Sequence, residues 1–257
     1  MAEAYAKAKN SVGAVCVTAG PGATNALPGL AEAYVDSTPI IVISGQVENI
    51  NTADYYKKLN IRTLGTAEFS ITRILKNITK YSVKLTDPNK SQYEIEKAIH
   101  ISKTGRPGPV WIEIPLDIQS KKVIKNKLKK FKPKYKQKNY IKLYKKIYFK
   151  LLNSKKPLFA IGNGLKQSGS KDIFNKIQKK LNIPYITTRF ANDIFPHKNK
   201  LNLGLCGIKG LPHTKKITEK CDLLIGLGSR FAPTFCMGSP KNFAKKIYTI
   251  SINNDQN

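Results

Sequence analysis

Residues 18–30 read TAGPGATNALPGL and continue a strand-like run that begins at residue 13. Two glycines on either side of Pro21 make this turn sharp and rigid, because glycine permits unusual backbone angles and proline fixes its own φ. Thr24 or Asn25 can cap a helix that follows the turn. Taken by itself, the turn is either an anion site at a helix N-terminus or a strand–helix turn without a ligand.

The rest of the chain repeats this alternation of strand and helix. In the first half, strands are expected at residues 14–18, 39–44 and 110–114, and helices at residues 1–9, 24–35 and 93–102. In the second half, strands are expected at residues 157–161, 184–188, 221–227 and 246–252, and a helix at residues 171–181. Such alternation implies crossover connections and parallel sheets.

We therefore predict an α/β fold with two doubly wound parallel-sheet (Rossmann-like) domains joined by a basic linker. The first domain is expected at residues 1–119, the linker at residues 120–155 and the second domain at residues 156–257. Within the linker, residues 139–152 predict an amphipathic helix, which is either an electrostatic patch or a solvated, charged connection.

Composition excludes several classes of protein. Apolar residues make up 41% of the 257 residues, enough to bury a core. No apolar run approaches the roughly 20 residues that span a bilayer, and the N-terminal residues lack the apolar centre of a signal peptide. We therefore expect a cytoplasmic protein without a membrane partner. The four cysteines lack metal-ligand spacing, and Cys16 and Cys221 are expected to be buried in strands.

The formal net charge of +29 is unevenly distributed. Residues 1–120 hold 13 basic and 11 acidic side chains, residues 121–150 hold 14 lysines and no acid, and residues 151–257 hold 18 basic and 5 acidic side chains. The excess is lysine rather than arginine, which is preferred for bidentate recognition of phosphates and bases. The charge predicts a solvated lysine-rich surface and does not favour a nucleic-acid partner.

Two turns of the second half carry glycines that suit a phosphate. Gly162 and Gly164 follow a strand, but a third glycine at dinucleotide-binding spacing is missing. Gly228 and Arg230 follow another strand, and the arginine either meets a phosphate or carboxylate or lies at the surface beside the strand ends. His100, His197 and His213 have no nucleophile-and-acid context, so the sequence predicts no conventional catalytic triad.

Five motifs of the first half occur together in order: AEAYA at 2–6, VTAGPGATN at 17–25, AYVDSTP at 33–39, ISGQ at 43–46 and GRPGPV at 105–110. They closely resemble the pyrimidine-binding domain of thiamine diphosphate-dependent enzymes of the acetolactate synthase (acetohydroxyacid synthase) branch. The second half resembles the central domain of this family through IGNG at 161–164, SG at 168–169, IP at 183–184, TT at 187–188 and DLLIGLGSR at 222–230.

The resemblance implies a cofactor site at the GPG turn. Thr18, Gly22 and Asn25 would line the pocket of the thiamine pyrimidine ring, with Gly20 and Pro21 shaping the turn. The pocket would lie at a subunit interface.

From the next strand end, Gln46 would point toward the cofactor or substrate. In this family the cofactor carries out decarboxylation of a 2-keto acid and addition to a second carbonyl compound.

Other parts of the family's site are expected outside the chain. The activating glutamate would precede Met1, and the diphosphate and Mg²⁺ would be held by a C-terminal domain, so the chain is expected to hold neither catalytic residues nor metal ligands. The central domain of acetolactate synthases also binds FAD, which would place Gly162, Gly164, Gly228 and Arg230 on a flavin or nucleotide. The family's Asp-Asp-Arg is replaced by APT at 232–234, which weakens the case for FAD.

Two functions remain open from the sequence. The first is an acetolactate synthase-like transferase of branched-chain amino-acid biosynthesis, present as a partial chain that is inactive alone. It would need the C-terminal thiamine diphosphate domain or a second subunit in a homo- or hetero-oligomer. The alternative is a non-catalytic pairing or regulatory module that associates with full-length relatives.

Overall fold

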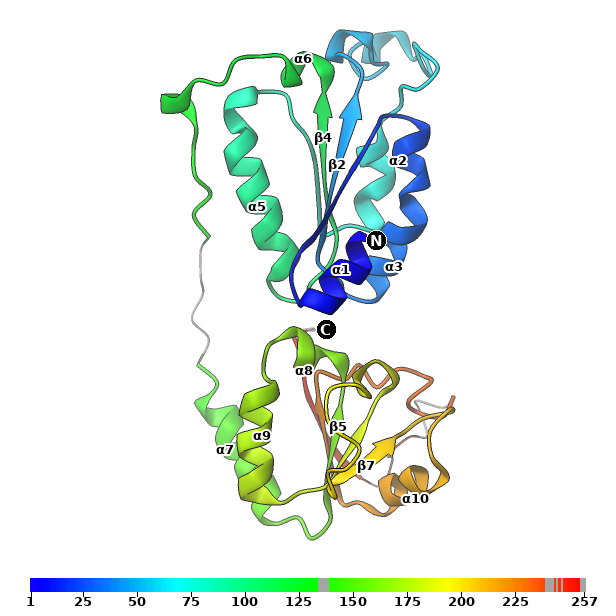
Figure 1. Cartoon of the computed structure of the whole chain (residues 1–257), viewed down its shortest axis with the longest axis vertical. Coiled ribbons are helices and arrows are strands. Elements are labelled where there is room, and N and C mark those ends of the chain that lie inside the picture. The colour runs from blue at the N-terminus through cyan, green and yellow to red at the C-terminus, as the bar shows by residue number, and fades with distance from the viewer. Residues whose placement is uncertain (134–138, 239–242, 244, 246, 255–257) are drawn as a thin grey trace. The chain divides into compact units, whose positions relative to one another are not determined.

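The structure is a computed structural model that describes residues 1–133, 139–238, 243, 245 and 247–254 (Figure 1). The chain divides into two compact units, Met1–Tyr135 and Lys136–Asn257. Each unit is built on one sheet of parallel strands, so the predicted α/β class with two parallel-sheet domains is confirmed. No helix in the described parts has the length and apolar character needed to cross a bilayer.

The first unit contains a four-stranded sheet in the order β1-β2-β4-β3. Its strands are β1 (Gly13–Val17), β2 (Ile40–Gln46), β3 (Tyr81–Lys84) and β4 (Val110–Pro115). Its helices are α1 (Ala2–Lys9), α2 (Pro21–Asn25), α3 (Leu27–Val35), α4 (Ile71–Ile74), α5 (Ser91–Lys103) and α6 (Leu116–Gln119). Short 3₁₀ turns are η1 (Asn49–Asn51), η2 (Lys57–Leu59), η3 (Leu75–Asn77), η4 (Pro88–Lys90) and η5 (Lys125–Lys127).

Helices cover both faces of this sheet, as the apolar runs of β2 and β4 require. Figure 1 shows α5 on one side of β2 and β4, and α2 and α3 on the other. On the α2 and α3 side, Trp111 is fully buried with Val42 and Leu30. On the α5 side, Ile112 packs with Ala98. The carboxyl ends of all four strands therefore lie along the same border of the sheet, where the loops that follow the strands gather.

The second unit contains a five-stranded sheet in the order β7-β6-β5-β8-β9. Its strands are β5 (Pro157–Ile161), β6 (Tyr185–Thr187), β7 (Asn202–Leu205), β8 (Leu223–Leu227) and β9 (Tyr248–Ile252). Its helices are α7 (Ile141–Leu152), α8 (Asn163–Gln167), α9 (Lys171–Leu181) and α10 (Pro212–Lys220), with the 3₁₀ turn η6 (Arg189–Ala191). On one face, Phe174 of α9 packs edge-on against Phe159 and Tyr185, with ring centroids 5.6 Å apart in both pairs.

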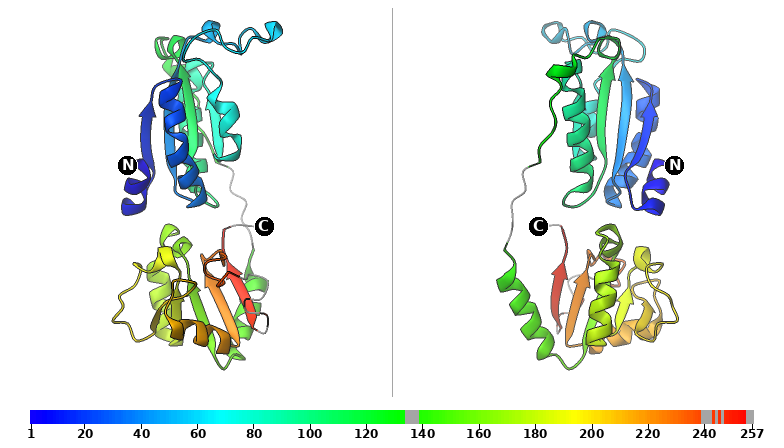
Figure 2. Two further views of the ribbon diagram at one scale, coloured as in Figure 1. Left: turned by 90° about the vertical axis from the view of Figure 1, so that its right-hand side faces the viewer. Right: turned by 60° about the vertical axis from the view of Figure 1, so that its left-hand side comes forward.

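Several expectations differ from the structure in detail. The single helix expected at residues 24–35 is two helices, α2 and α3, that meet at Ala26. Cys16 is exposed, so its expected burial is wrong. The reason is that β1 lies at the edge of the sheet, as Figure 2 shows, and β1 turns alternate side chains outward. Cys221 is buried, at the end of α10 just before β8.

The helix expected within the basic linker is present as α7. Ile147 and Leu151 are its half-buried side chains, and Leu151 packs against the core of the second unit. Its lysines are exposed, as a solvated charged helix requires. Residues 134–138 of the expected linker lie outside the described residues.

Candidate functional site

The turn after β1 depends on its glycines for close packing. Gly20 has a φ of 59°, and a Cβ atom at this position would lie 2.6 Å from the carbonyl oxygen of Ala67. A Cβ atom on Gly22 would lie 2.5 Å from the Cγ2 atom of Thr18. The turn is therefore shaped by contacts within the protein, and it brings Ala67 to the carboxyl end of β1.

The helix after this turn begins earlier than the sequence predicts. Gly20 is the N-cap and Pro21 opens α2, a position that proline favours because it needs no N–H donor there. Thr24 lies inside α2, where its hydroxyl donates to the carbonyl oxygen of Pro21 at 3.1 Å. Asn25 is the last residue of α2 and is exposed. Neither Thr24 nor Asn25 caps the helix, so that expectation is wrong.

Gln46 ends β2 and is buried, with 6% of its surface exposed. Its Nε2 atom donates to the carbonyl oxygen of Phe69 and to Oε1 of Glu113, both at 3.0 Å. Its Oε1 atom accepts the N–H of Val47 at 2.9 Å. The amide of Gln46 therefore connects β2 to β4 and to the segment that leads into α4. Its role as a contact of a cofactor or substrate stays a prediction.

Glu113 is a buried acid that the sequence analysis missed. It lies in β4, in register with Ser44 of β2 and Lys84 of β3, and only 1% of its surface is exposed. Burial raises the pKa of Glu113 to about 7, although Lys84 and Gln46 oppose this. One signal pointed to it, because a glutamate inside the apolar strand sequence VWIEIP must be buried if both faces of the sheet are covered.

The segment between β2 and α4 forms a pocket at the same edge. Its volume is about 480 Å³, and it is lined by Val47, Ile50, Asn51, Tyr56 and Leu64–Glu68. Glu68 holds these loops together, because its Oε1 accepts the N–H of Ala53 at 2.9 Å and its Oε2 accepts the N–H of Leu64 at 3.1 Å. Ala67 lines the pocket and also touches Gly20, so the pocket adjoins the turn after β1.

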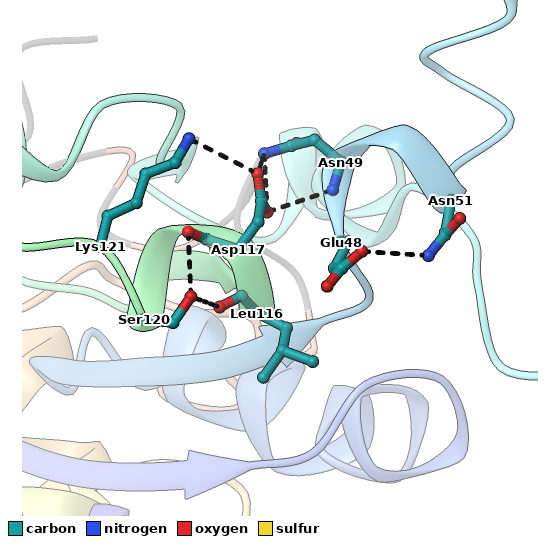
Figure 3. Close-up of polar contacts among 7 residues, drawn as sticks. All are labelled: Glu48, Asn49, Asn51, Leu116, Asp117, Ser120 and Lys121. Carbon is teal, nitrogen blue, oxygen red and sulfur yellow. Dashed lines mark hydrogen bonds and ion pairs between the residues drawn. The ribbon is translucent and has the colours of Figure 1, made fainter.

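A second clamp fixes the start of this segment (Figure 3). Oδ1 of Asp117 accepts the backbone N–H and the Nδ2 of Asn49, both at 3.1 Å, and Oδ2 also accepts from Nδ2 at 3.1 Å. The Nζ atom of Lys121 lies 4.0 Å from Oδ2 of Asp117, and its positive charge stabilises the carboxylate. Burial raises the pKa of Asp117, but the bonds from Asn49 and the charge of Lys121 outweigh it and hold that pKa below its usual value. This clamp connects η1 to α6.

The structure places the predicted pyrimidine residues at the carboxyl ends of the strands, but they differ in exposure and do not all lie on the surface. Thr18 and Asn25 are exposed, Gly22 is half-buried, and Gly20 and Gln46 are buried. None of the six predicted residues is among those that line the pocket of residues 47–68. The connection between the predicted residues and the pocket runs through Ala67 and Phe69, which contact Gly20 and Gln46.

The two glycine turns of the second unit pack directly against each other. A Cβ atom on Gly162 would lie 2.1 Å from the carbonyl oxygen of Gly228, and one on Gly164 would lie 2.8 Å from the Cα atom of Gly228. Their N–H groups are used within the protein: Gly162 donates to Leu227 at 2.9 Å, Gly164 to Gly228 at 3.1 Å, and Gly228 to Ile252 at 2.9 Å. Close packing of the two turns therefore explains why glycine is present at these positions, without a bound phosphate. Arg230 is exposed.

Three carboxylates form a cluster elsewhere in the first unit, on α1 and at the end of α3. Glu3, Glu32 and Asp36 lie close enough to share an ion. The ammonium group of Lys7 already forms ion pairs with Glu3 and Asp36, both at 2.7 Å. This cluster is therefore explained as a structural ion-pair network.

Comparison with known proteins identifies the two halves. The family described as "Thiamine pyrophosphate enzyme, N-terminal TPP binding domain" matches residues 1–64, and the family described as "Thiamine pyrophosphate enzyme, central domain" matches residues 145–257. The first match contains β1, the Gly20 turn and β2, and the second contains β5 to β9.

Similar relatives include the acetolactate synthase large subunit of Lactococcus lactis subsp. lactis, which is 34% identical over 99% of this chain and 43% of the relative. The acetolactate synthase large subunit of Cyanidium caldarium is 35% identical over 90% of this chain and 39% of the relative. The probable acetolactate synthase large subunit of Methanocaldococcus jannaschii is 31% identical over 99% of this chain and 42% of the relative. The chain thus spans less than half the length of these relatives, and it belongs to the thiamine pyrophosphate enzyme family, of which it carries the N-terminal and central domains.

Proposed function

We propose that this chain contributes the pyrimidine side of a thiamine diphosphate-dependent, acetolactate synthase-like enzyme. The observation that carries the proposal is the identity of 34% with an acetolactate synthase large subunit over 99% of the chain. The reaction would be decarboxylation of a 2-keto acid and addition to a second carbonyl compound, as the resemblance implies. When bound, thiamine diphosphate supplies the nucleophilic carbon for this chemistry.

The residues at the carboxyl edge of the first sheet suit a flat heterocyclic ring. Val47, Ile50 and Leu64 offer apolar walls, and Asn51 and Thr66 offer polar groups in the same pocket. Such a mixture of apolar walls and a few polar groups is typical of small-molecule sites. The Gly20 turn adjoins this pocket through Ala67, so both features belong to one candidate site.

The diphosphate and Mg²⁺ are proposed to bind residues outside this chain, in a C-terminal domain or second subunit of an oligomer. The N–H groups of Gly162, Gly164 and Gly228 donate to backbone carbonyls of the protein, so the proposal does not depend on FAD bound at these turns. We place the protein in the cytoplasm, in keeping with the expectation from the sequence.

A reconstitution experiment tests the proposal. The purified chain is titrated with thiamine diphosphate and Mg²⁺ by isothermal calorimetry, first alone and then with a polypeptide that carries the remaining C-terminal part of the Lactococcus lactis relative. Binding heat only in the mixture would support the proposed half-site. Turnover is not required of this mixture, because the activating glutamate is expected to precede Met1. Absence of binding heat in a mixture whose two chains associate would contradict the proposal.

A matched pair of variants locates the site. Asn25→Ala removes an exposed amide at the end of α2, and Asn175→Ala removes a half-buried amide from α9 of the second unit. The proposal expects weaker cofactor binding in the mixture for Asn25→Ala and unchanged binding for Asn175→Ala. Association of the chain with a full-length relative, without any effect of Asn25→Ala on cofactor affinity, would favour the non-catalytic pairing module instead.

A further inference from the structure

Glu113 lies where an ionised group is costly. Its side chain is 1% exposed, and its neighbours on the same face of β4 and β2 include Trp111, which is fully buried. Taking a carboxylate out of water without full compensation is strongly unfavourable. An ordinary core position would hold an apolar residue here, so the carboxyl group needs an explanation.

The contacts of Glu113 are incomplete. Its Oε1 accepts one hydrogen bond from Gln46 at 3.0 Å, whereas its buried Oε2 has no hydrogen-bond partner among the described residues. Lys84, in register on β3, attracts the charged form, and the carboxylates of Asp54 and Glu68 repel it. Ser44, in register on β2, instead accepts the indole N–H of Trp111 at 2.8 Å. Among the described residues, Gln46 is thus the only hydrogen-bond partner of this carboxyl group.

Through Gln46, Glu113 reaches the wall of the pocket. The Nε2 atom that donates to Glu113 also donates to the carbonyl oxygen of Phe69, next to Glu68. An amide nitrogen has two hydrogens, and these two acceptors use both of them. The acceptor on Glu113 therefore determines the orientation of the Gln46 amide. That amide in turn holds the carbonyl group of Phe69, and the adjacent Glu68 accepts the N–H groups of Ala53 and Leu64.

We propose that Glu113 is a positioning residue of the candidate site, which orients Gln46 and thereby holds the segment from Leu64 to Phe69 in place as the pocket wall. The inference rests on the proposed function only for the identity of the ligand, because the arrangement itself belongs to the chain alone. The pKa of Glu113, raised by burial to about 7, makes the arrangement sensitive to pH near neutrality. Opening that exposes Glu113 to water lets it ionise, so opening becomes easier as pH rises.

Amide hydrogen exchange of the full chain, without any cofactor, tests this inference. The reporters are the N–H groups of Val47, Ala53 and Leu64, which donate to Gln46 and Glu68. Glu113→Leu removes the acceptor, and we expect exchange about tenfold faster at all three reporters. Glu113→Gln keeps a side-chain oxygen as acceptor and is expected to protect the reporters at least as well as the unmodified chain does.

Ser44→Ala is the matched control. It removes the buried hydroxyl that lies in register with Glu113 on β2. Among the described residues, this hydroxyl forms a hydrogen bond with Trp111 and does not take part in the hydrogen bonds of Gln46. We expect it to leave the three reporters within about twofold of the unmodified chain. Equal exchange in Glu113→Leu and in the unmodified chain would overturn the inference, as would equal acceleration in Ser44→Ala.

A pH series gives a second readout that does not need Glu113→Leu to fold. Between pH 6 and pH 8, protection at the reporters, corrected for intrinsic exchange, should fall by about tenfold in the unmodified chain and stay constant in Glu113→Gln. The same pH dependence in both chains would exclude Glu113 as its source. Because no cofactor is present, failure here is distinct from failure of the reconstitution experiment, which would contradict the proposed function and leave the positioning role standing.

Discussion

Gly20 and Ala67 touch backbone to backbone: a Cβ atom on Gly20 would lie 2.6 Å from the carbonyl oxygen of Ala67. These residues are far apart in sequence, yet their contact joins the turn after β1 to the wall of the pocket. The turn that the resemblance predicts at the cofactor is therefore also a packing element. A change at Gly20 should affect both stability and the candidate site.

Gly20→Ala should destabilise the first unit more than Gly105→Ala does. Both glycines have a positive φ, 59° and 63°, and at Gly20 the ψ of −120° also lies outside the left-handed region that residues with a side chain adopt. Only Gly20 also meets a backbone oxygen, whereas no atom lies within 4 Å of a Cβ on Gly105. We expect a loss of roughly 2–4 kcal/mol for Gly20→Ala and about 1 kcal/mol for Gly105→Ala.

Urea denaturation followed by tryptophan fluorescence measures this difference. The chain has a single tryptophan, Trp111, which is buried in the first unit, so the signal reports on that unit alone. Equal losses for the two variants would show that the Gly20–Ala67 contact yields without cost. The pair therefore measures what the contact with Ala67 and the ψ of Gly20 together add to the cost of a positive φ.

The stability of the first unit should fall as pH rises from about 4.5 to about 7. The pKa of Glu113 is raised from 4.5 to about 7 in the folded chain, so the folded chain holds this proton where the unfolded chain has released it. Folding then binds a proton, and the free energy of unfolding decreases with pH across this window and is flat above it. The decrease attributable to Glu113 is at most roughly 3 kcal/mol.

Comparison with Glu113→Gln isolates this contribution from those of other groups. The difference in unfolding free energy between the two chains, measured by Trp111 fluorescence at pH 5, 6, 7 and 8, should change in favour of Glu113→Gln as pH rises. A difference that is constant with pH would mean that Glu113 titrates alike in the folded and unfolded chain.

Much of the fold could be predicted because its signals are local. The apolar runs that form β2, β4, β5 and β8 and the periodicity of α9 lie within short windows of sequence. The exposure of Cys16 could not be predicted in the same way, since it depends on β1 lying at the edge of the sheet. Strand order is set by long-range pairing, which local periodicity does not contain.

The candidate site was predictable at its turn and, through the resemblance, at Gln46. The GPG sequence marks the carboxyl end of β1, because glycine and proline have strong local preferences. The contacts of Gln46 with Glu113 and Phe69 join three segments that are distant in sequence, so no local sequence pattern predicts them. The glycines at 162, 164 and 228 resemble a phosphate cradle in sequence, but the structure shows that they pack against each other.

Gly162→Ala should destabilise the second unit strongly. Its Cβ would lie 2.1 Å from the carbonyl oxygen of Gly228, and this backbone is held by neighbouring strands. We expect a loss of roughly 3 kcal/mol or more. Gly169→Ala is the control, because Gly169 has a φ of 67° but no atom within 4 Å of its Cβ, and it should lose about 1 kcal/mol.

Thiol labelling across a urea gradient reports on the second unit. Cys206, Cys221 and Cys236 are buried there, whereas Cys16 is exposed in the first unit and should react at once in the native chain. Gly162→Ala should expose the three buried thiols at a lower urea concentration than Gly169→Ala does. Identical labelling midpoints would contradict the close packing of the two turns.

Asp117→Ala should weaken the first unit through the loss of the clamp on Asn49. The carboxylate accepts from the backbone N–H and the side-chain amide of Asn49, and bonds of this charged kind contribute about 1.5–3 kcal/mol at most. We expect a loss of about 1–2 kcal/mol at pH 7. Ser120→Ala, which removes exposed hydroxyl bonds to Leu116 and Asp117, should change stability by less than about 0.5 kcal/mol.

The effect of Asp117→Ala should also depend on pH in a defined direction. Burial raises the pKa of Asp117, but the bonds from Asn49 and the charge of Lys121 hold it below the usual 3.8. A lowered pKa contributes stability that is present above the unfolded value and lost as pH falls through the folded value. The difference in unfolding free energy between Asp117→Ala and the unmodified chain, followed by Trp111 fluorescence, should therefore become smaller below about pH 4. A gap that stays constant between pH 7 and pH 3 would show that the carboxylate charge takes no part in holding Asn49, and that the clamp acts through packing alone.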